Sequence, residues 1–295
     1  MRLFLIIKSF INHPIGKRSL FLSFKKFLFF QIYFRVMKGE YLYSWINDSK
    51  FFVSPGETGI TGNLYFGLHE FEDMSFLLHY INDKDVFFDI GSNVGSYTIL
   101  SGVVKRCTVH SFEPNPQTFI KLKRNLSVNP EGLKINLHNV GLGAKKGYLM
   151  FTNYNVSTLN HVVIDNKEEN VVKVKIETLD HLGIIPNIIK IDVEGFEHYV
   201  IKGGLKTLKN ENLKCIIIEL NDSGKKYSQN KNDVFEQLKS LGFKSYKYSP
   251  FKKELTPIDG INNSGNNTLL LRGSLDFFNK RLSMSEKYVV NDIKI

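Results

Sequence analysis

The fold is decided by Val86-Phe87-Phe88-Asp89-Ile90-Gly91-Ser92-Asn93-Val94-Gly95-Ser96-Tyr97-Thr98. An apolar run ends in an acid, a turn with spaced small residues follows, and a segment with helical periodicity comes next. This order predicts a strand, a loop and a helix that open a βαβ unit, the arrangement by which α/β proteins bind nucleotide-like cofactors. Glycine lets the backbone of such a loop turn tightly and approach a ligand closely.

A second apolar run, residues 108–113, ends in another acid, Glu113. It lies about twenty residues beyond the loop, and in dinucleotide folds an acid at that distance binds the ribose hydroxyls. The glycines of the loop do not follow the pattern Gly-x-Gly-x-x-Gly. In addition, Asp89 lies at the strand end, where its negative charge would repel a pyrophosphate. The pattern Asp-x-Gly-x-Asn-x-Gly therefore favours a cofactor with a cationic amino-acid end and no phosphate, and S-adenosylmethionine is such a molecule.

A set of ordered segments resembles the FkbM-type methyltransferases, a family of S-adenosylmethionine-dependent enzymes. The segments are residues 87–95, Phe112-Glu113-Pro114-Asn115-Pro116, Ser157-Thr158-Leu159, Thr178-Leu179-Asp180, residues 189–197 and Ile216-Ile217-Ile218-Glu219-Leu220. The resemblance covers residues 85–245. It implies an α/β class I methyltransferase Rossmann-like fold, in which a mostly parallel seven-stranded sheet carries helices on both faces and a helical N-terminal extension is added.

Strand-like and helix-like segments alternate from residue 85 onward, which predicts parallel strands joined by right-handed crossovers. We expect strands at 85–90, 108–113, 134–140, 187–193, 214–220, from 242 onward and at 267–272. We expect helices at 74–81, 95–105, 115–128, from 197 onward and at 232–241, and a β excursion at 146–151 and 171–176. The chain divides into four parts. They are a basic aromatic extension (1–50), a lead-in segment with a turn at 59–63 and a helix covering the cofactor site (51–84), the methyltransferase domain (85–273) and a polar C-terminal tail (274–295).

The formal net charge of +10 is unevenly distributed, because all the bases up to Lys38 precede the first acid, Glu40. The remainder is close to balanced, so the basicity concerns the N-terminal arm. Two cysteines, Cys107 and Cys215, fall at or in expected strands and are interpreted as small buried hydrophobic residues. Their scarcity is typical of a reducing cytoplasm. No group of cysteine and histidine has the spacing of zinc ligands.

The segment Leu20–Val36 is interpreted as a basic amphipathic helix. Its aromatic face either packs on the core or a second subunit, which we favour, or attaches residues 1–40 peripherally to an anionic membrane. The apolar run at 3–7 is too short to span a bilayer, and no small-residue cleavage site follows, so we expect no signal peptide. The expected location is the cytoplasm, with the inner face of the membrane as the alternative for a peripheral contact.

The resemblance and the loop chemistry together imply a set of cofactor-binding residues. Asp89 binds the amino end of the methionine, Gly91 and Gly95 give backbone access, and Asn93 offers an amide. Glu113 accepts hydrogen bonds from the ribose hydroxyls. Asn115 either lies beside the adenine or caps the following helix, and Asn139 is a candidate contact to the adenine edge.

Asp192 and Glu194 are the candidate catalytic residues, because strand alternation is expected to put both carboxylates on one side at the end of a strand. Methyl transfer to a hydroxyl needs a group that takes its proton, and a carboxylate can act as this general base. Asp192 is the first choice. The alternatives are that the two acids clamp substrate hydroxyls or hold a divalent cation, or that Glu194 caps the next helix. Ser157 and Thr158 line the acceptor pocket or form an ordinary turn, and Glu219 orients the substrate.

The implied reaction is O-methylation of a hydroxyl, on a sugar of a surface glycan, glycolipid or secondary metabolite. One alternative is methylation of RNA ribose, although no nucleic-acid partner is expected from the near-balanced core. The other is a non-catalytic membrane-associated binding module. The sequence leaves the acceptor, the metal dependence and the oligomeric state open.

Overall fold

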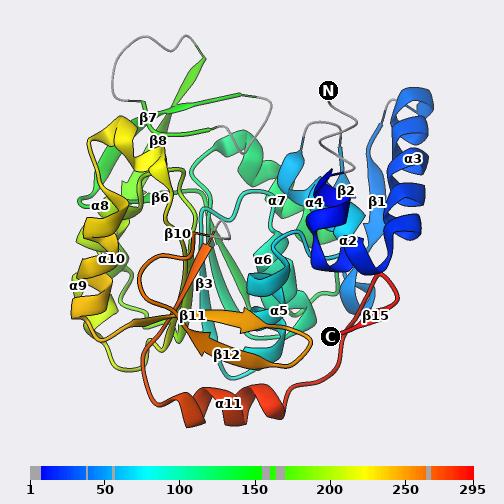
Figure 1. Cartoon of the computed structure of the whole chain (residues 1–295). Helices are drawn as coiled ribbons and strands as arrows, with labels where there is room; N and C mark the ends of the chain where they lie inside the picture. The colour runs from blue at the N-terminus through cyan, green and yellow to red at the C-terminus, as the bar shows by residue number, and fades with distance from the viewer. Residues whose placement is uncertain (1–7, 38, 55–56, 155–159, 164–169, 264–266) are drawn as a thin grey trace.

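The central sheet has eight strands in the order β12-β11-β13-β10-β9-β3-β4-β5 (Figure 1). The computed structural model describes residues 8–37, 39–54, 57–154, 160–163, 170–263 and 267–295. The strands β5, β4, β3, β9 and β10 run parallel, whereas β13 is antiparallel to both β10 and β11, and β12 is antiparallel to β11. The expected class I methyltransferase-like α/β fold with a mostly parallel sheet is confirmed.

For the central sheet the sequence predicts seven strands, one fewer than the described residues form there. The strands are β3 (Val86–Ile90), β4 (Thr108–Phe112), β5 (Ile135–His138), β9 (Ile188–Ile191), β10 (Cys215–Glu219), β11 (Lys244–Ser249), β12 (Glu254–Pro257) and β13 (Asn267–Leu271). The missed strand is β12, a short polar segment that ends in proline. It pairs with β11 at the edge of the sheet, where a proline in a strand is tolerated.

Two hydrophobic layers cover the sheet, because successive side chains of a strand point to opposite faces. Phe87, Val109, Ile188 and Ile217 pack with α5 (Phe71–Tyr80), α6 (Ser96–Thr98), η2 (Ile99–Val104) and α11 (Leu275–Ser283). Phe88, Ile90, Ile189 and Ile216 pack with α8 (Glu197–Lys202), α9 (Leu205–Lys209) and α10 (Lys231–Ser240).

The helix expected at 95–105 is divided in the structure into a short α-helical turn, α6, and a wider π-helical segment, η2.

A second sheet holds the expected β excursion. It consists of β6 (Gly141–Leu142), β7 (Gly147–Thr152) and β8 (Val171–Glu177), in the order β6-β8-β7, and β8 leads into the short helix η4 (Leu179–Leu182). The strands β7 and β8 are antiparallel and pair along their whole length. This sheet lies beside the carboxyl end of the central sheet, and residues from both of its edges face the site described below (Figure 1).

The described parts of residues 8–80 pack against one side of the central fold. They form α2 (Pro14–Arg18), α3 (Leu20–Met37), β1 (Tyr41–Ser44), η1 (Ile46–Asp48), β2 (Lys50–Val53) and α4 (Thr58–Phe66), followed by α5. The turn expected at 59–63 is wrong, since this segment is helical. Ile60 and Leu64 lie one helical turn apart and are both fully buried, so tertiary packing outweighs the local preference of the glycines.

The C-terminal tail is part of the core, which its polar composition does not suggest. After α11, the chain ends in a hairpin of β14 (Val289–Val290) and β15 (Ile293–Lys294). The short helix η5 (Asp222–Tyr227) lies earlier, between β10 and α10. Tyr288, Val290 and Ile295 are buried at the hairpin. The side chain of Lys26 donates a hydrogen bond to Asn291, so the helix α3 contacts this hairpin.

Helix α3 confirms the expected helix but not its amphipathic character. Its inner face buries Phe27 and Phe30, which contact the aromatic rings of Phe10, Tyr65 and Tyr41. Its outer face is apolar as well, with Phe21 and Ile32 well exposed. Packing on the core is therefore seen, but a second apolar face stays uncovered. Among the described residues, no helix combines the length and the hydropathy that crossing a bilayer requires.

Both cysteines are buried and free, as expected.

We predict that Gly91→Ala destabilises the protein far more than a glycine replacement elsewhere. A Cβ atom at Gly91 would lie 1.8 Å from the carbonyl oxygen of Asp192, and φ is +81°. Gly260 has nearly the same φ, +82°, with nothing within 4 Å of its Cβ position. Gly260→Ala should cost about 1–2 kcal/mol from its backbone conformation alone, and Gly91→Ala at least about 3 kcal/mol. Urea unfolding of the two variants measures the difference, and equal losses would contradict the close approach.

Candidate active site

The site lies where the chain order of the sheet reverses. From β3 the chain adds β4 and β5 on one side and then returns to place β9 and β10 on the other. Ligands of open α/β sheets bind outside the carboxyl ends of the strands at such a point. The loop after β3 and the turn after β9 flank this position and are hydrogen-bonded, because the amide of Asp192 donates to the carbonyl of Ile90 at 3.0 Å.

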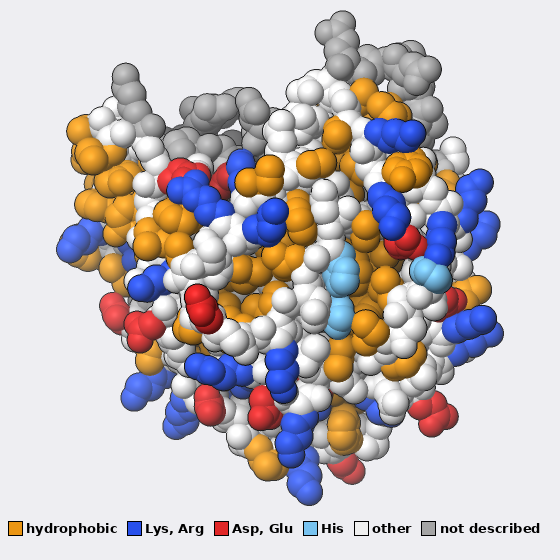
Figure 2. All heavy atoms as spheres, turned by 180° about the vertical axis from the view of Figure 1, so that it is seen from behind, with side chains coloured by type: hydrophobic (Ala, Val, Ile, Leu, Met, Phe, Trp, Pro, Cys, Tyr) orange, Lys and Arg blue, Asp and Glu red, His pale blue; other side chains and the backbone are white. Residues whose placement is uncertain are grey.

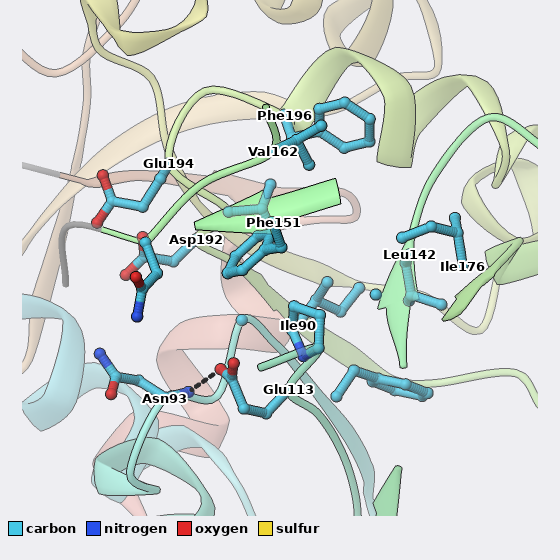
Figure 3. A pocket seen from close by; sticks show the side chains of 16 residues that line it. Ile90, Asn93, Glu113, Leu142, Phe151, Val162, Ile176, Asp192, Glu194 and Phe196 are labelled. Atoms are coloured by element: carbon cyan, nitrogen blue, oxygen red, sulfur yellow. Dashed lines mark hydrogen bonds between the residues drawn. The ribbon is translucent and has the colours of Figure 1, made fainter. Parts of the chain in front are cut away.

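Glu113 holds the loop after β3 in place. Its Oε2 accepts the backbone N–H of Asn93 at 3.0 Å (Figure 3). Its Oε1 accepts the backbone N–H of Asn115 at 2.9 Å. Each carboxylate oxygen keeps a further lone pair, so hydrogen bonds to ligand hydroxyls remain open to it. Burial raises the pKa of Glu113 to about 7, although these two N–H donors oppose the shift.

Asp89 is almost fully buried at the end of β3. Its carboxylate accepts a hydrogen bond from the Thr98 hydroxyl at 2.6 Å, and that hydroxyl also contacts Ser111 at 2.6 Å. Burial raises the pKa of Asp89 to about 6, while Thr98 and then Lys190 oppose the shift. The glycines of the following loop adopt left-handed conformations, with φ of +81° at Gly91 and +99° at Gly95. A Cβ at Gly95 would lie 2.6 Å from Leu122.

Asn115 and Asn139 support the site from outside its cavities. The side chain of Asn115 caps α7 (Pro116–Ser127) by accepting the N–H groups of Gln117 and Thr118, which is the capping alternative. Asn139 donates to the carbonyls of Glu113 and Pro114 at 2.8 and 3.1 Å. Neither residue lines either of the cavities described below, so their contact to a cofactor stays a prediction.

Asp192 and Glu194 come together for a reason other than the expected one. The strand β9 ends at Ile191, not 193, so strand alternation does not extend to Glu194. Instead, Glu194 adopts a left-handed conformation with φ of +53°, in a turn whose amides at Val193 and Gly195 donate to the carboxylate of Glu197. This turn brings Glu194 back beside Asp192 (Figure 3). The start of α8 has no side-chain cap, so the capping alternative for Glu194 is not seen. Glu197 instead holds the turn, and burial raises its pKa to about 7.

Lys190 also lies in the site, and the sequence reasoning overlooked it. Its side chain is 3% exposed, and its ammonium forms a 2.6 Å ion pair with Asp192 and lies 4.7 Å from the centre of the Tyr97 ring. Burial alone would lower its pKa, but the charges of Asp192, Glu70 and Asp89 outweigh burial and hold the pKa above its ordinary value. A lysine inside the apolar strand Ile188-Ile189-Lys190-Ile191 is the feature that could have revealed it.

Glu219, at the end of β10, completes an acidic cluster. One carboxylate oxygen from each of Asp192, Glu194 and Glu219 lies within 4.8 Å of the others, and in the described part of the chain this is the group of acids, histidines and cysteines close enough to share a metal ion. Burial and then the charge of Asp192 raise the pKa of Glu194 to about 7. Burial and the charges of Asp192 and Glu194 raise the pKa of Glu219 well above its ordinary value.

Two adjoining cavities meet at these residues. The first encloses about 780 Å³, including space open to solvent, and is mainly apolar, with Ile90, Phe112, Leu142, Phe151, Val162 and Phe196 around Glu113 (Figure 3). The second encloses about 840 Å³ and is polar. It is lined by Glu57, His69, Glu70, Asp89, Lys190 and Glu219. Gly91, Asn93, Asp192 and Glu194 line both cavities.

Two buried polar atoms of the loop are available to a ligand. Within the described residues, Ser92 Oγ and Asn93 Oδ1 have no hydrogen-bond partner. An unpaired buried polar atom costs free energy, so a ligand that reaches the loop can satisfy them. Both residues line the second cavity, and Asn93 also lines the first. The expected acceptor-pocket residues Ser157 and Thr158 lie outside the described residues.

The sequence model of the methyltransferase FkbM domain matches residues 89–245. The chain belongs to this family. The matched range contains the loop after β3, Glu113 and the acids that follow β9. The family resemblance drawn from the ordered motifs is thereby confirmed.

Curated relatives cover part of the chain. It is 31% identical over 147 residues to the hexuronic acid methyltransferase AglP of Haloferax volcanii, covering 49% of this chain and 59% of the relative. It is 30% identical over 171 residues to methyltransferase 1 of Beauveria bassiana, covering 48% of this chain and 66% of the relative. The chain thus matches less than two thirds of the length of each.

Among solved structures, an rRNA methylase from Streptococcus thermophilus shares 16% identity, with a TM-score of 0.37 over 68% of this chain and 95% of that chain. The strand order described above, rather than this overlap, identifies the fold.

We predict that the protein without ligands loses stability as the pH rises from about 4 to about 7. Burial raises the pKa values of Asp89, Glu113 and Glu194 to about 6, 7 and 7 in the folded state. The folded protein therefore holds more protons than the unfolded chain in this window, and stability falls with pH where this is so. Urea unfolding at several pH values measures the slope.

Glu219→Gln should flatten this slope and make the protein more stable above neutral pH than the wild type, because the amide cannot ionise in the unfolded chain. Glu236→Gln, at an exposed position on α10, is the matched control and should leave the slope unchanged. A stability that rises with pH over this range would contradict the assigned burial of the acids.

Proposed function

We propose that this chain is an S-adenosylmethionine-dependent methyltransferase that methylates a hydroxyl of a neutral sugar. The observation that carries the proposal is the meeting of an apolar cavity around Glu113 and an acid-lined cavity around Asp89 at the shared residues Asp192 and Glu194. Family membership supports the reaction class, and the relative named a hexuronic acid methyltransferase supports a sugar acceptor.

The residues present fit S-adenosylmethionine. Glu113 has free lone pairs for two ribose hydroxyls, and apolar side chains beside it suit an adenine ring. The unpartnered atoms of Ser92 and Asn93, together with Asp89, suit a polar amino-acid end. Among the described residues that line the second cavity, the acids outnumber the lysine, which favours a ligand with cationic groups. When bound, the cofactor supplies an electrophilic methyl group.

The chain's own residues hold the acceptor and take its proton. A sugar hydroxyl becomes a competent nucleophile as its proton leaves, and a carboxylate within hydrogen-bond reach can accept that proton. The ion pair with Lys190 engages Asp192, so we assign the base to Glu194, whose pKa of about 7 suits neutral pH. Asp192 then positions the acceptor. This reverses the order of preference that the sequence suggests.

The polar cavity also bears on the acceptor. Its lining includes Glu57, Glu70 and Glu219 beside the acid pair, and Lys190 is its lysine. Protonated and ionised carboxyl groups pair well with sugar hydroxyls, whereas an anionic group there meets like charges. A neutral, hydroxyl-rich ring is therefore favoured over a hexuronic acid. For the same reason the phosphates of an RNA chain are disfavoured at this site.

We expect Glu113→Gln to weaken the binding of S-adenosylmethionine and S-adenosylhomocysteine by at least about tenfold. An amide at this position offers one acceptor oxygen, and its NH₂ group opposes a backbone N–H of Asn93 or Asn115. Asp89→Asn should weaken binding too. Calorimetric titration measures the affinities.

The matched control is Asp73→Asn, which alters a buried acid of similar pKa on α5 that lines neither cavity. It should bind the cofactor as the wild type does once circular dichroism shows it folded. A folded wild-type protein that binds neither compound would overturn the proposed function.

We expect Glu194→Gln to keep cofactor affinity and to lose about 10²–10⁴-fold in turnover, the usual contribution of a general base. Asp192→Asn should raise the KM for the acceptor as well as lower kcat, because it positions the sugar. The assay follows methyl transfer from labelled S-adenosylmethionine to a panel of neutral sugars, hexuronic acids and lipid-linked sugars.

A chelator separates the two roles that the acids can have. If Glu194 acts as a base, turnover persists in EDTA and falls at low pH as the carboxylate is protonated. Turnover that is lost in EDTA and restored by Mg²⁺ or Ca²⁺ would contradict the assignment of Glu194 as the base and indicate that the acids bind a metal ion.

A further inference from the structure

We propose that the outer face of α3 binds the surface of an anionic membrane. The face consists of Phe21, Phe24, Leu28, Phe29, Ile32 and Val36, which we call the α3 outer face. These side chains are 83%, 39%, 45%, 51%, 62% and 71% exposed. This surface is separate from the cofactor site, and the inference does not rest on the proposed function.

Five of these residues recur every three or four positions, and Phe29 directly follows Leu28, so they share one side of the helix. The opposite side of α3 already packs on the protein through Phe27 and Phe30. A helix that is apolar all round is ordinarily covered all round. Figure 2 shows the outer face as a group of hydrophobic side chains at the left edge, with basic side chains beside it. A contiguous exposed apolar surface of this kind marks an interaction site.

The charges beside this face select the partner. From residue 8 to residue 37 the sequence contains no acid, and the bases Lys25 and Arg35 on α3 are exposed, as is Lys17 on the preceding helix α2. Phenylalanine and leucine that insert between lipid chains, with lysine and arginine at the phosphates, are typical of interfacial helices. Lys25 lies among the apolar residues, and its long aliphatic stem can reach the headgroups from there.

A second copy of the chain is a poorer occupant. In a two-fold dimer across α3, Lys25 and Arg35 of one copy would approach the same bases of the other, with no acid on the helix to pair with them. Crossing of the bilayer is a different arrangement, and no described helix is long and apolar enough for it. The helix would therefore lie parallel to the membrane plane.

The two adjacent lysines of α3 point in different directions. Lys26 directly follows Lys25 but faces the protein, where it donates to Tyr43 at 2.8 Å and to Asn291. Burial lowers its pKa to about 8, although the charge of Asp292 opposes the shift. Of two adjacent lysines, one thus anchors the helix to the C-terminal hairpin, and the other is free to meet lipid phosphates.

The experiment is co-sedimentation of the full chain with vesicles of phosphatidylcholine alone or with about one third phosphatidylglycerol. We expect binding to the anionic vesicles, and a loss of at least about tenfold in bound fraction for Phe21→Ser/Ile32→Ser and for Lys25→Glu/Arg35→Glu. The matched controls replace residues of the same types on other helices. They are Phe277→Ser/Ile120→Ser, at side chains that are 45% and 60% exposed, and Lys206→Glu/Lys280→Glu. The controls should bind as the wild type does.

Thermal unfolding followed by circular dichroism establishes that each variant is folded, and sedimentation velocity gives its oligomeric state. The proposal is overturned if the wild type binds no vesicles, if it binds neutral vesicles equally well, or if the α3 variants and their controls lose binding alike. A wild-type dimer that Phe21→Ser/Ile32→Ser converts to a monomer, without any vesicle binding, would overturn it in favour of self-association.

Discussion

The absence of a side chain at Gly91 allows three strand ends to meet. Its amide and that of Ser92 donate to the carbonyl of Phe112 at the end of β4, while its Cα lies against the carbonyl of Asp192 after β9. The loop after β3 is therefore fixed from both sides at once. This places Asp89, Glu113 and the acids of the next turn around one space, although each comes from a different strand. The left-handed φ at Gly91 is the second reason why only glycine fits there.

Charge is the next constraint, because many carboxylates lie close together in the site and few of them are paired with a positive charge. Lys190 is the buried cation of the polar cavity, and it is shared between Asp192 and the aromatic face of Tyr97. The phenol of Tyr97 in turn donates to Glu70 at 2.5 Å, which ties α5 to the base of the site. The remaining acids respond by binding protons more readily, as the raised pKa values of Asp89 and Glu194 indicate.

The sequence predicts most of the fold because the strands and helices of the βαβ units alternate as local apolar runs, which can be recognised without knowledge of distant contacts. It predicts Asp89, Glu113 and the acid pair because motifs place them at strand ends. It misses β12, the buried tail around Tyr288 and the helix α4, since each owes its form to packing against residues far along the chain. Glu194 illustrates a correct proximity with a wrong cause, because a left-handed turn replaces the expected strand. Lys190 was overlooked because much of its surroundings, the ring of Tyr97 and the charges of Glu70 and Asp89, comes from parts of the chain far from it in sequence.

Because the two cavities share Asp192 and Glu194, occupancy of one bears on the chemistry of the other. The pKa of Glu194 is raised first by burial and then by the negative charge of Asp192. A positive charge bound beside these acids opposes both effects, since it stabilises the carboxylate that burial disfavours. A cationic cofactor would therefore lower the pKa of Glu194 and prepare it to accept a proton. After transfer the product carries one positive charge fewer, and the base returns toward its protonated form. On this argument the excess of acids is a means of making the base available when the methyl donor is bound.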